Sequence, residues 1–393
     1  MINNLIYLYR KFTPGVWILT LLHLLFVSRT TLFSIRRSVG DYSVMVSSST
    51  VMVFVVITLS ILVIFNNLYC FKHANKTINR LIFFYIVCVS SCIWAGFQSV
   101  IIFKSIEVLC NLYLMYIIAM KIGNIRLLLL YIIVLSTITA YVDVLDGILK
   151  LGIWFMHTNS YSMASMIAFL LGIQAIRNHV LEFKEIKYLL FFNLIAIIFG
   201  TSSATYISFI IGLLIVYSSG PKGIKFPKLF IFLIFSIIFF YVAYDVLLEF
   251  IFQGKTEDDI KTGTGRSAIF EAAINSWQDS PLIGHGYIIG QRNLSQFGLG
   301  TDVLSCHNTF LAILVDTGLL GMSFFLYFLI TWINNLIRKC KNNSYAVILL
   351  PALLASLINC FTYPAIGSDW SYVGSLIFLM YIMTNLFINR IKY

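Results

Sequence analysis

The chain has 393 residues, of which 60% are hydrophobic and only 11% are charged, and its mean hydropathy is +0.91. A soluble domain would carry about a quarter charged residues, so the composition excludes an ordinary soluble protein. The formal net charge of +11 does not indicate a nucleic-acid partner, because the cations form short clusters between apolar runs. The seven cysteines are scattered and form no pair at metal-binding spacing.

Apolar runs suited to membrane-spanning helices recur along the whole chain, without the alternation of a barrel. The sequence therefore predicts an all-α, polytopic membrane protein of about 12 transmembrane helices. Nine spans fall within residues 1–251 and three within residues 308–393. The predicted spans are 15–34, 44–66, 81–97, 99–121, 126–146, 162–177, 187–200, 203–219, 228–251, 308–335, 345–363 and 371–388.

The charge distribution gives an independent prediction of orientation. With both termini inside, the inner segments hold 18 of the 27 Lys and Arg residues. Positive charge is retained on the cytoplasmic side of a membrane, so this bias supports the orientation. Residues 252–307 then form one large loop outside, which is far longer than any other connection and is the most polar part of the chain. Long loops usually carry function, so we expect the chemistry there.

Within this loop, residues 266–278 are predicted to form a short amphipathic helix. Its apolar stripe would consist of Phe270, Ala273, Ile274 and Trp277, with Trp277 as an anchor at the membrane–water interface. Arg266 would lie in the first turn, where backbone N–H groups are free, and this combination suits a diphosphate. The alternative is that Arg266 only extends to lipid headgroups.

Two histidines of the loop are candidate bases. His307 precedes the tenth span and could accept a proton from a hydroxyl near neutral pH, with Asn308 positioning the ring or a substrate hydroxyl. His285 lies between two glycines and is a second candidate. For His307 the alternative is a structural hydrogen bond to a loop carbonyl, and for His285 the alternative is that the residue only fills a turn.

Ionisable residues within predicted spans tend to face a cavity or a substrate path. Of these, Arg29 and Lys104 are candidates for binding an anionic lipid headgroup, although Lys104 could simply pair with Glu107 at i+3. No spacing typical of a metal site is present, and no GxSxG motif supports serine hydrolysis.

Two blocks carry a family resemblance. They read GTGRSAIF…W…SPLIGHGY over residues 263–287 and CHNTFLAILVDTGLLG over residues 306–321. Both blocks, in this order and in a chain with one large loop before the tenth span, resemble the O-antigen polymerase and ligase superfamily of bacterial glycan transferases, of the Wzy and WaaL type.

The resemblance implies a specific reaction, in which a glycan carried on undecaprenyl diphosphate is transferred to a sugar hydroxyl on the outer face of the bacterial inner membrane. It implies an inverting, metal-independent glycosyltransferase that needs no cofactor. Arg266 matches the arginine that binds the diphosphate, and His307 matches the proposed general base. Partners would be the lipid-linked oligosaccharide, the lipid bilayer and, for a polymerase, a chain-length regulator protein.

One departure concerns a Ser-Arg pair that members often carry in a mid-chain span. The matching stretch, residues 200–205, reads GTSSAT and has no arginine. Arg292, Arg29 or Lys104 are candidates to replace it as substrate-binding residues.

Three functions compete at this point. Ligases often carry a second histidine before the HN pair, whereas Ser305 and Cys306 stand there in this chain, which favours a polymerase over a ligase. A flippase of lipid-linked oligosaccharide is the alternative from another class. The halves of the chain show no repeat and the polar residues gather outside the spans, which disfavours a transporter.

Overall fold

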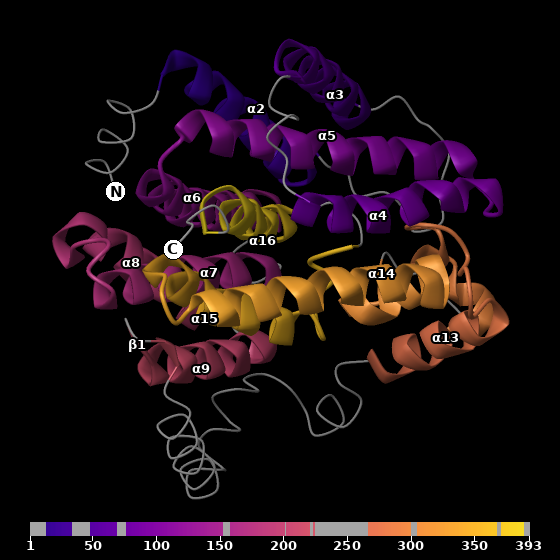
Figure 1. The fold of residues 1–393 in the computed structure, drawn as a ribbon. Helices are drawn as coiled ribbons and strands as arrows, with labels where there is room; N and C mark the ends of the chain where they lie inside the picture. Colours follow the sequence, from indigo (N-terminus) through magenta and orange to yellow (C-terminus); the bar gives the residue numbers. More distant parts are fainter. Residues whose placement is uncertain are drawn as a thin grey trace, which may run out of the picture.

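The computed structural model describes residues 13–33, 48–68, 76–151, 158–200, 202–220, 223–224, 266–299, 305–367 and 371–388. These residues form almost only helices (Figure 1). The α-helices are α2 (Pro14–Phe33), α3 (Ser48–Asn66), α4 (Lys76–Ser90), α5 (Gln98–Ile122), α6 (Ile125–Leu151), α7 (Thr158–Arg177), α8 (Phe183–Phe199), α9 (Ser203–Ser218), α13 (Arg266–Asp279), α14 (Thr309–Lys339), α15 (Ser344–Asn359) and α16 (Tyr372–Met383).

Short elements connect these helices. They are the 3₁₀ turns η2 (Ser91–Ile93), η3 (Gly290–Arg292) and η4 (Leu294–Phe297), the π-helical turn η5 (Thr384–Ile388), and an antiparallel pair of two-residue strands, β1 (Ser219–Gly220) and β2 (Gly223–Ile224). The strand pair was not predicted, and it only closes the turn after α9.

Helices occur at eleven of the twelve predicted spans, and the remaining one, 228–251, lies outside the described residues. Among the described residues, four helical segments are long and apolar enough to cross a membrane, namely Gln98–Ile122, Ile125–Val142, Asn159–Arg177 and Thr309–Lys339. Large apolar side chains also point outward from the bundle, for example Phe65, Phe191 and Phe199. Exposing so many large apolar side chains is unfavourable in water but not in lipid.

The helix ends follow local rules. Pro14 begins α2 at the position where a missing N–H costs nothing. Gly123 ends α5 in the left-handed conformation. Glu182 and Glu185 form a reciprocal capping box at the start of α8. The local sequence thus accounts for where these helices start and stop.

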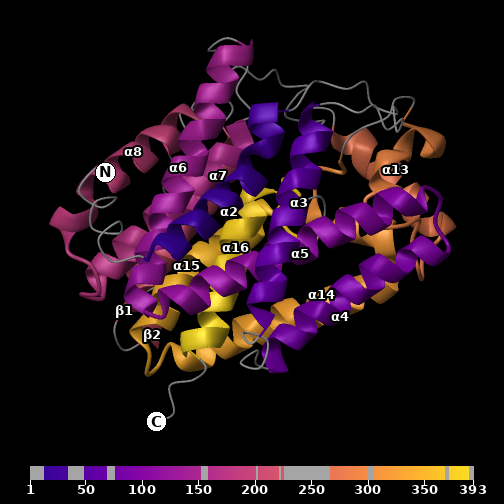
Figure 2. The ribbon, with the colours of Figure 1, turned by 90° about the horizontal axis from the view of Figure 1, so that it is seen from above.

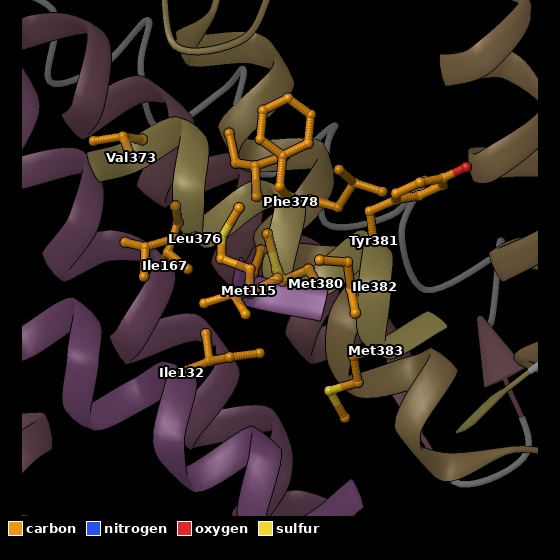
Figure 3. Close-up of a cluster of buried hydrophobic side chains, with 14 of the residues drawn as sticks. Met115, Ile132, Ile167, Val373, Leu376, Phe378, Met380, Tyr381, Ile382 and Met383 are labelled. Carbon is orange, nitrogen blue, oxygen red and sulfur yellow. The ribbon is translucent and has the colours of Figure 1, made fainter. Parts of the chain in front are cut away.

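α16 lies at the centre of the bundle. All twelve of its residues are buried, and α5, α6, α7, α2 and α15 surround it (Figure 2). Figure 3 shows side chains of α16 packed against Met115 of α5, Ile132 of α6 and Ile167 of α7. The last predicted span of the chain thus forms the core of the bundle.

Several polar contacts of charged side chains gather at one end of the bundle. At one end, Arg126 at the start of α6 binds the Glu185 carboxylate at 2.8 and 3.0 Å and the Val180 carbonyl at 2.9 Å. Arg177 at the end of α7 donates to the Val216 carbonyl of α9 at the same end. These cations belong to the segments predicted to lie inside, and they lie together.

Candidate active site

α14 is not one straight helix. Gly318 has φ 63° and ψ −164°, which breaks the helix between Thr317 and Leu319. The rings of Phe310 and Phe325 lie only 6.2 Å apart, whereas fifteen residues of straight helix would separate them by about 22 Å. The chain therefore turns back at Gly318. Within the predicted span 308–335, residues 309–317 thus form a short half-helix beside the long segment 319–339.

The break is closed by the segment Pro281–Gly286 of the large loop, which we call the clasp. The clasp amides of His285 and Gly286 donate to the Val315 and Asp316 carbonyls at 2.9 and 2.8 Å. In return, the Leu319 and Leu320 amides donate to the carbonyls of residues 281 and 282 at 2.9 and 3.0 Å. A helix break leaves carbonyls on one side and N–H groups on the other without partners, and the clasp supplies both.

Two glycines permit this close approach. A Cβ on Gly318 would lie 2.4 Å from the Leu282 carbonyl, and one on Gly284 would lie 2.6 Å from the Asp316 carbonyl carbon. Both residues also have positive φ, at 63° and 65°. Gly284 of the first block and Gly318 of the second thus allow the two blocks to pack closely against each other.

Asp316 fixes the next part of the loop. Its carboxylate is fully buried and accepts the backbone N–H of Ile288 and both the backbone and the side-chain N–H of Gln291, each at 2.9 Å. Ile288 has φ 68°, which is rare for a β-branched residue. Asp316 was not among the candidate site residues predicted from the sequence. The sequence contains one indication of its structural role, because Asp316 lies next to an apolar run. A buried carboxylate there needs hydrogen-bond donors around it.

α13 runs beside the half-helix in the same direction. Ala272 and Ala273 cluster with Cys306, Ala312 and Val315. At the far end, the Ser276 carbonyl binds the His285 ring, whose amide binds the Val315 carbonyl. Ile269, in the first turn of α13, packs against the same cluster, which includes Cys306 next to His307. Figure 1 shows α13 lying along α14.

The predicted start of α13 at Arg266 is confirmed, and the residues of the predicted apolar stripe differ in their exposure. Ala273 is buried and Trp277 packs against the cluster, but Ile274 is 42% exposed. The face turned to α14 consists instead of the small residues Ala272, Ala273 and Ser276. Small side chains allow the two helices to approach closely, which helical periodicity alone does not reveal.

Arg266 is the first residue of α13 and is partly buried. Burial lowers the pKa of its guanidinium. An arginine side chain in a protein carries its charge at neutral pH. A desolvated guanidinium beside the free amides of a helix start can bind an anion with two parallel hydrogen bonds.

His307 lies directly before the half-helix and is partly exposed. Its backbone has φ 51°, and its amide donates to the Ser305 hydroxyl at 3.0 Å. Asn308 is the N-cap, since its side-chain oxygen accepts the Phe310 and Leu311 amides at 2.8 and 3.1 Å. The oxygen of Asn308 is thus used in the fold, and sequence reasoning missed this cap.

The other end of the α13–half-helix pair holds His285 and Arg292. The Nε2 atom of His285 binds the Ser276 carbonyl at 2.7 Å and lies 3.8 Å from Asp279. Arg292 ends η3, one residue after Gln291, and its charge acts on the Asp316 carboxylate. Neither residue shares the end at which Arg266 and His307 lie.

Lys104 and Arg29 belong to helices that do not carry the motif blocks. Lys104 of α5 is 3.3 Å from the fully buried Glu107, so the pairing considered in the sequence analysis is present. Arg29 lies on α2, and its side chain is outside the described residues.

The stretch without an arginine, residues 200–205, is connected to the region around His307 by contacts with α15. The Asn359 side chain of α15 donates to the Thr205 hydroxyl at 2.9 Å, and the adjacent Cys360 carbonyl accepts the Thr309 amide at 2.9 Å. Ser202 caps α9 and donates to Asn159 at 2.6 Å. Uncharged groups thus line the ends of α9 and α15 beside the half-helix.

Comparison with known proteins gives one match. Residues 188–326, about a third of the chain, match the family model described as O-antigen ligase (Wzy_C), and this range includes both sequence blocks. No curated protein matches the chain. The match supports the resemblance drawn from the two blocks and the helical membrane architecture. Over residues 188–326 the chain is thus similar to the O-antigen ligase family, which supports its place in the O-antigen polymerase and ligase superfamily.

Proposed function

We propose that the chain is an O-antigen or capsular polysaccharide polymerase. In this proposal it transfers a glycan from undecaprenyl diphosphate to a sugar hydroxyl of a lipid-linked repeat unit. The reaction takes place on the outer face of the bacterial inner membrane, where the large loop lies, and a chain-length regulator protein is a possible partner. The observation that carries the proposal is the register of α13 with the half-helix, which brings Arg266 and His307 to the same end.

The proposed step is a direct displacement. The acceptor hydroxyl oxygen attacks the anomeric carbon, and its proton passes to the His307 ring. The bond from that carbon to the diphosphate oxygen breaks, and the lipid diphosphate leaves with the electron pair. Arg266 and the backbone amides of the first turn of α13 stabilise the developing negative charge. Attack from the opposite face inverts the anomeric centre. The proposal needs no metal ion or cofactor.

The choice of polymerase over ligase rests on the residues before His307. Cys306 is completely buried in the α13 contact, and Ser305 accepts the His307 amide. Neither side chain supplies the second histidine that ligases often carry there.

The test replaces His307 or Arg266 with alanine in a strain that lacks the native gene, and examines surface polysaccharide on a gel. A general base contributes about 10²–10⁴-fold to the rate of such a reaction. A group that stabilises developing negative charge contributes about 10²–10³-fold. Both variants should therefore lose the polysaccharide ladder. His179→Ala is the matched control, because His179 is exposed, has a similar φ of 58° and lies at the other end of the bundle. Normal ladders from both site variants would refute the assignment.

The strain without the gene separates the three functions. A polymerase defect leaves core that carries a single repeat unit. A ligase defect leaves unmodified core although the polymerase of the strain is intact. A flippase defect leaves repeat units on the cytoplasmic leaflet.

A further inference from the structure

A cavity of about 450 Å³ opens between the turn after α4 and the large loop. Its volume falls in the range of about 300–1,000 Å³ that ligand sites usually have. One wall comes from residues 94–97 and the other from residues 279–293. The side chains that matter for its chemistry are Trp94, Phe97, Asp279, Ser280, His285 and Asn293.

Both walls are fixed by contacts across the fold. The Tyr287 amide donates to the Ser91 hydroxyl at 2.9 Å, and a Cβ on Gly286 would lie 2.3 Å from the Ala95 side chain. Ser280 donates to the Gly284 carbonyl at 3.1 Å. The clasp then joins this wall to α14. A cavity held in this way loses little conformational freedom when a ligand binds.

The lining favours a neutral ligand with many hydroxyl groups. Trp94 and Phe97 are both partly exposed and offer aromatic faces, on which the C–H face of a sugar ring packs. Asp279 and Asn293 accept hydrogen bonds from hydroxyl groups. Neither Lys nor Arg is among the described residues that line the cavity, so it does not suit a phosphate.

The His285 ring adds a directed acceptor. Its Nε2 atom must carry the hydrogen in order to donate to the Ser276 carbonyl at 2.7 Å. In the neutral ring the Nδ1 atom is then the acceptor. The hydrogen bond in the fold thus sets the tautomer of a residue that lines the cavity.

The cavity is remote from the proposed reacting end. Asp279 and Arg266 are the two ends of α13, and thirteen residues of helix span about 20 Å. A single sugar cannot touch both ends of this helix, whereas an oligosaccharide can. We propose that the cavity binds a sugar of the glycan several positions away from the bond that forms. The proposal deepens the transferase function and rests on it. Remote binding of this kind raises the rate for the longer substrate.

The test measures binding to the purified full chain in nanodiscs. The probe is the oligosaccharide released by mild acid from the lipid-linked repeat that accumulates in the strain without the gene. Titration calorimetry should show at least about tenfold weaker binding for Trp94→Ala and Asn293→Ala, and recovery for Trp94→Phe. Ile93→Ala is the matched control, because Ile93 is 77% exposed, is adjacent to Trp94 and does not line the cavity. Its affinity should equal that of the unchanged chain.

The outcomes separate this proposal from the proposed function. His307→Ala should bind the oligosaccharide normally while it makes no polymer. Equal affinity of the unchanged chain and the Trp94 and Asn293 variants would overturn the cavity assignment and leave the transferase assignment intact. Displacement of the oligosaccharide by undecaprenyl phosphate would show that the cavity takes lipid, and would overturn it too. Normal polymer from His307→Ala, with weak binding by Trp94→Ala, would refute the proposed mechanism and keep the sugar site.

Discussion

The Asp316 carboxylate accepts both the backbone N–H and the side-chain amide of Gln291, each at 2.9 Å. A third bond of equal length comes from the Ile288 amide. Asp316 precedes the break in α14, and Ile288 and Gln291 follow the clasp. One buried carboxylate therefore holds the large loop against the half-helix that begins after His307.

We expect Asp316→Asn to destabilise the protein. The asparagine amide keeps one oxygen and turns its NH₂ group toward a backbone N–H, so at least one buried donor loses its acceptor. Such a loss costs about 1–3 kcal/mol. The midpoint of thermal unfolding in detergent should fall, and polymer synthesis should fall with it. Glu271→Gln makes the same chemical change at an exposed position of α13, and an equal fall there would contradict the explanation.

Gly318→Ala should weaken the fold at the turn of α14. The backbone conformation of Gly318 is one that only glycine adopts easily, which adds strain of about 1–3 kcal/mol. The new Cβ would also collide with the Leu282 carbonyl at 2.4 Å. Gly298→Ala separates the two effects, since Gly298 has φ 101° but open space around its Cβ position. Thermal unfolding should show a larger loss for Gly318→Ala, and equal losses would mean that the contact with the clasp contributes nothing.

Asn308→Ala should cost about 1 kcal/mol, because the first turn of the half-helix loses its cap. Asn308→Ser keeps a capping oxygen, so both stability and polymer synthesis should be close to those of the unchanged chain. Paired measurements of unfolding and of the polysaccharide ladder check this. Should Asn308→Ser unfold normally and make no polymer, the Asn308 amide acts on the substrate or on the His307 ring.

Cys306 should react slowly with thiol reagents. Burial raises the pKa of its thiol well above the ordinary value, so less thiolate is present at pH 8. In variants that keep only one cysteine, iodoacetamide should label Cys306 at least about tenfold more slowly than the less buried Cys92. Fast labelling of Cys306 would contradict this prediction and would indicate an accessible thiolate next to His307.

Part of the candidate site could be predicted from residues alone. The helix start at Arg266 was predicted correctly, because glycines before it and Pro281 after it are local information. The partners of His285 and the cap formed by Asn308 were not predicted. A hydrogen bond from His285 to the Ser276 carbonyl depends on how the chain turns after α13, and no local pattern encodes that turn.

The sequence by itself determined that the chain is a bundle of membrane helices, because hydropathy is a sum over neighbouring residues and needs no knowledge of packing. It also determined that the two blocks belong to one functional region. Only the tertiary structure decided that the tenth span turns back at Gly318. Apolar runs lie before Asp316 and after Gly318, so hydropathy continues through the break. The bonds that stabilise the turn come from Pro281–Gly286, more than thirty residues earlier in the chain.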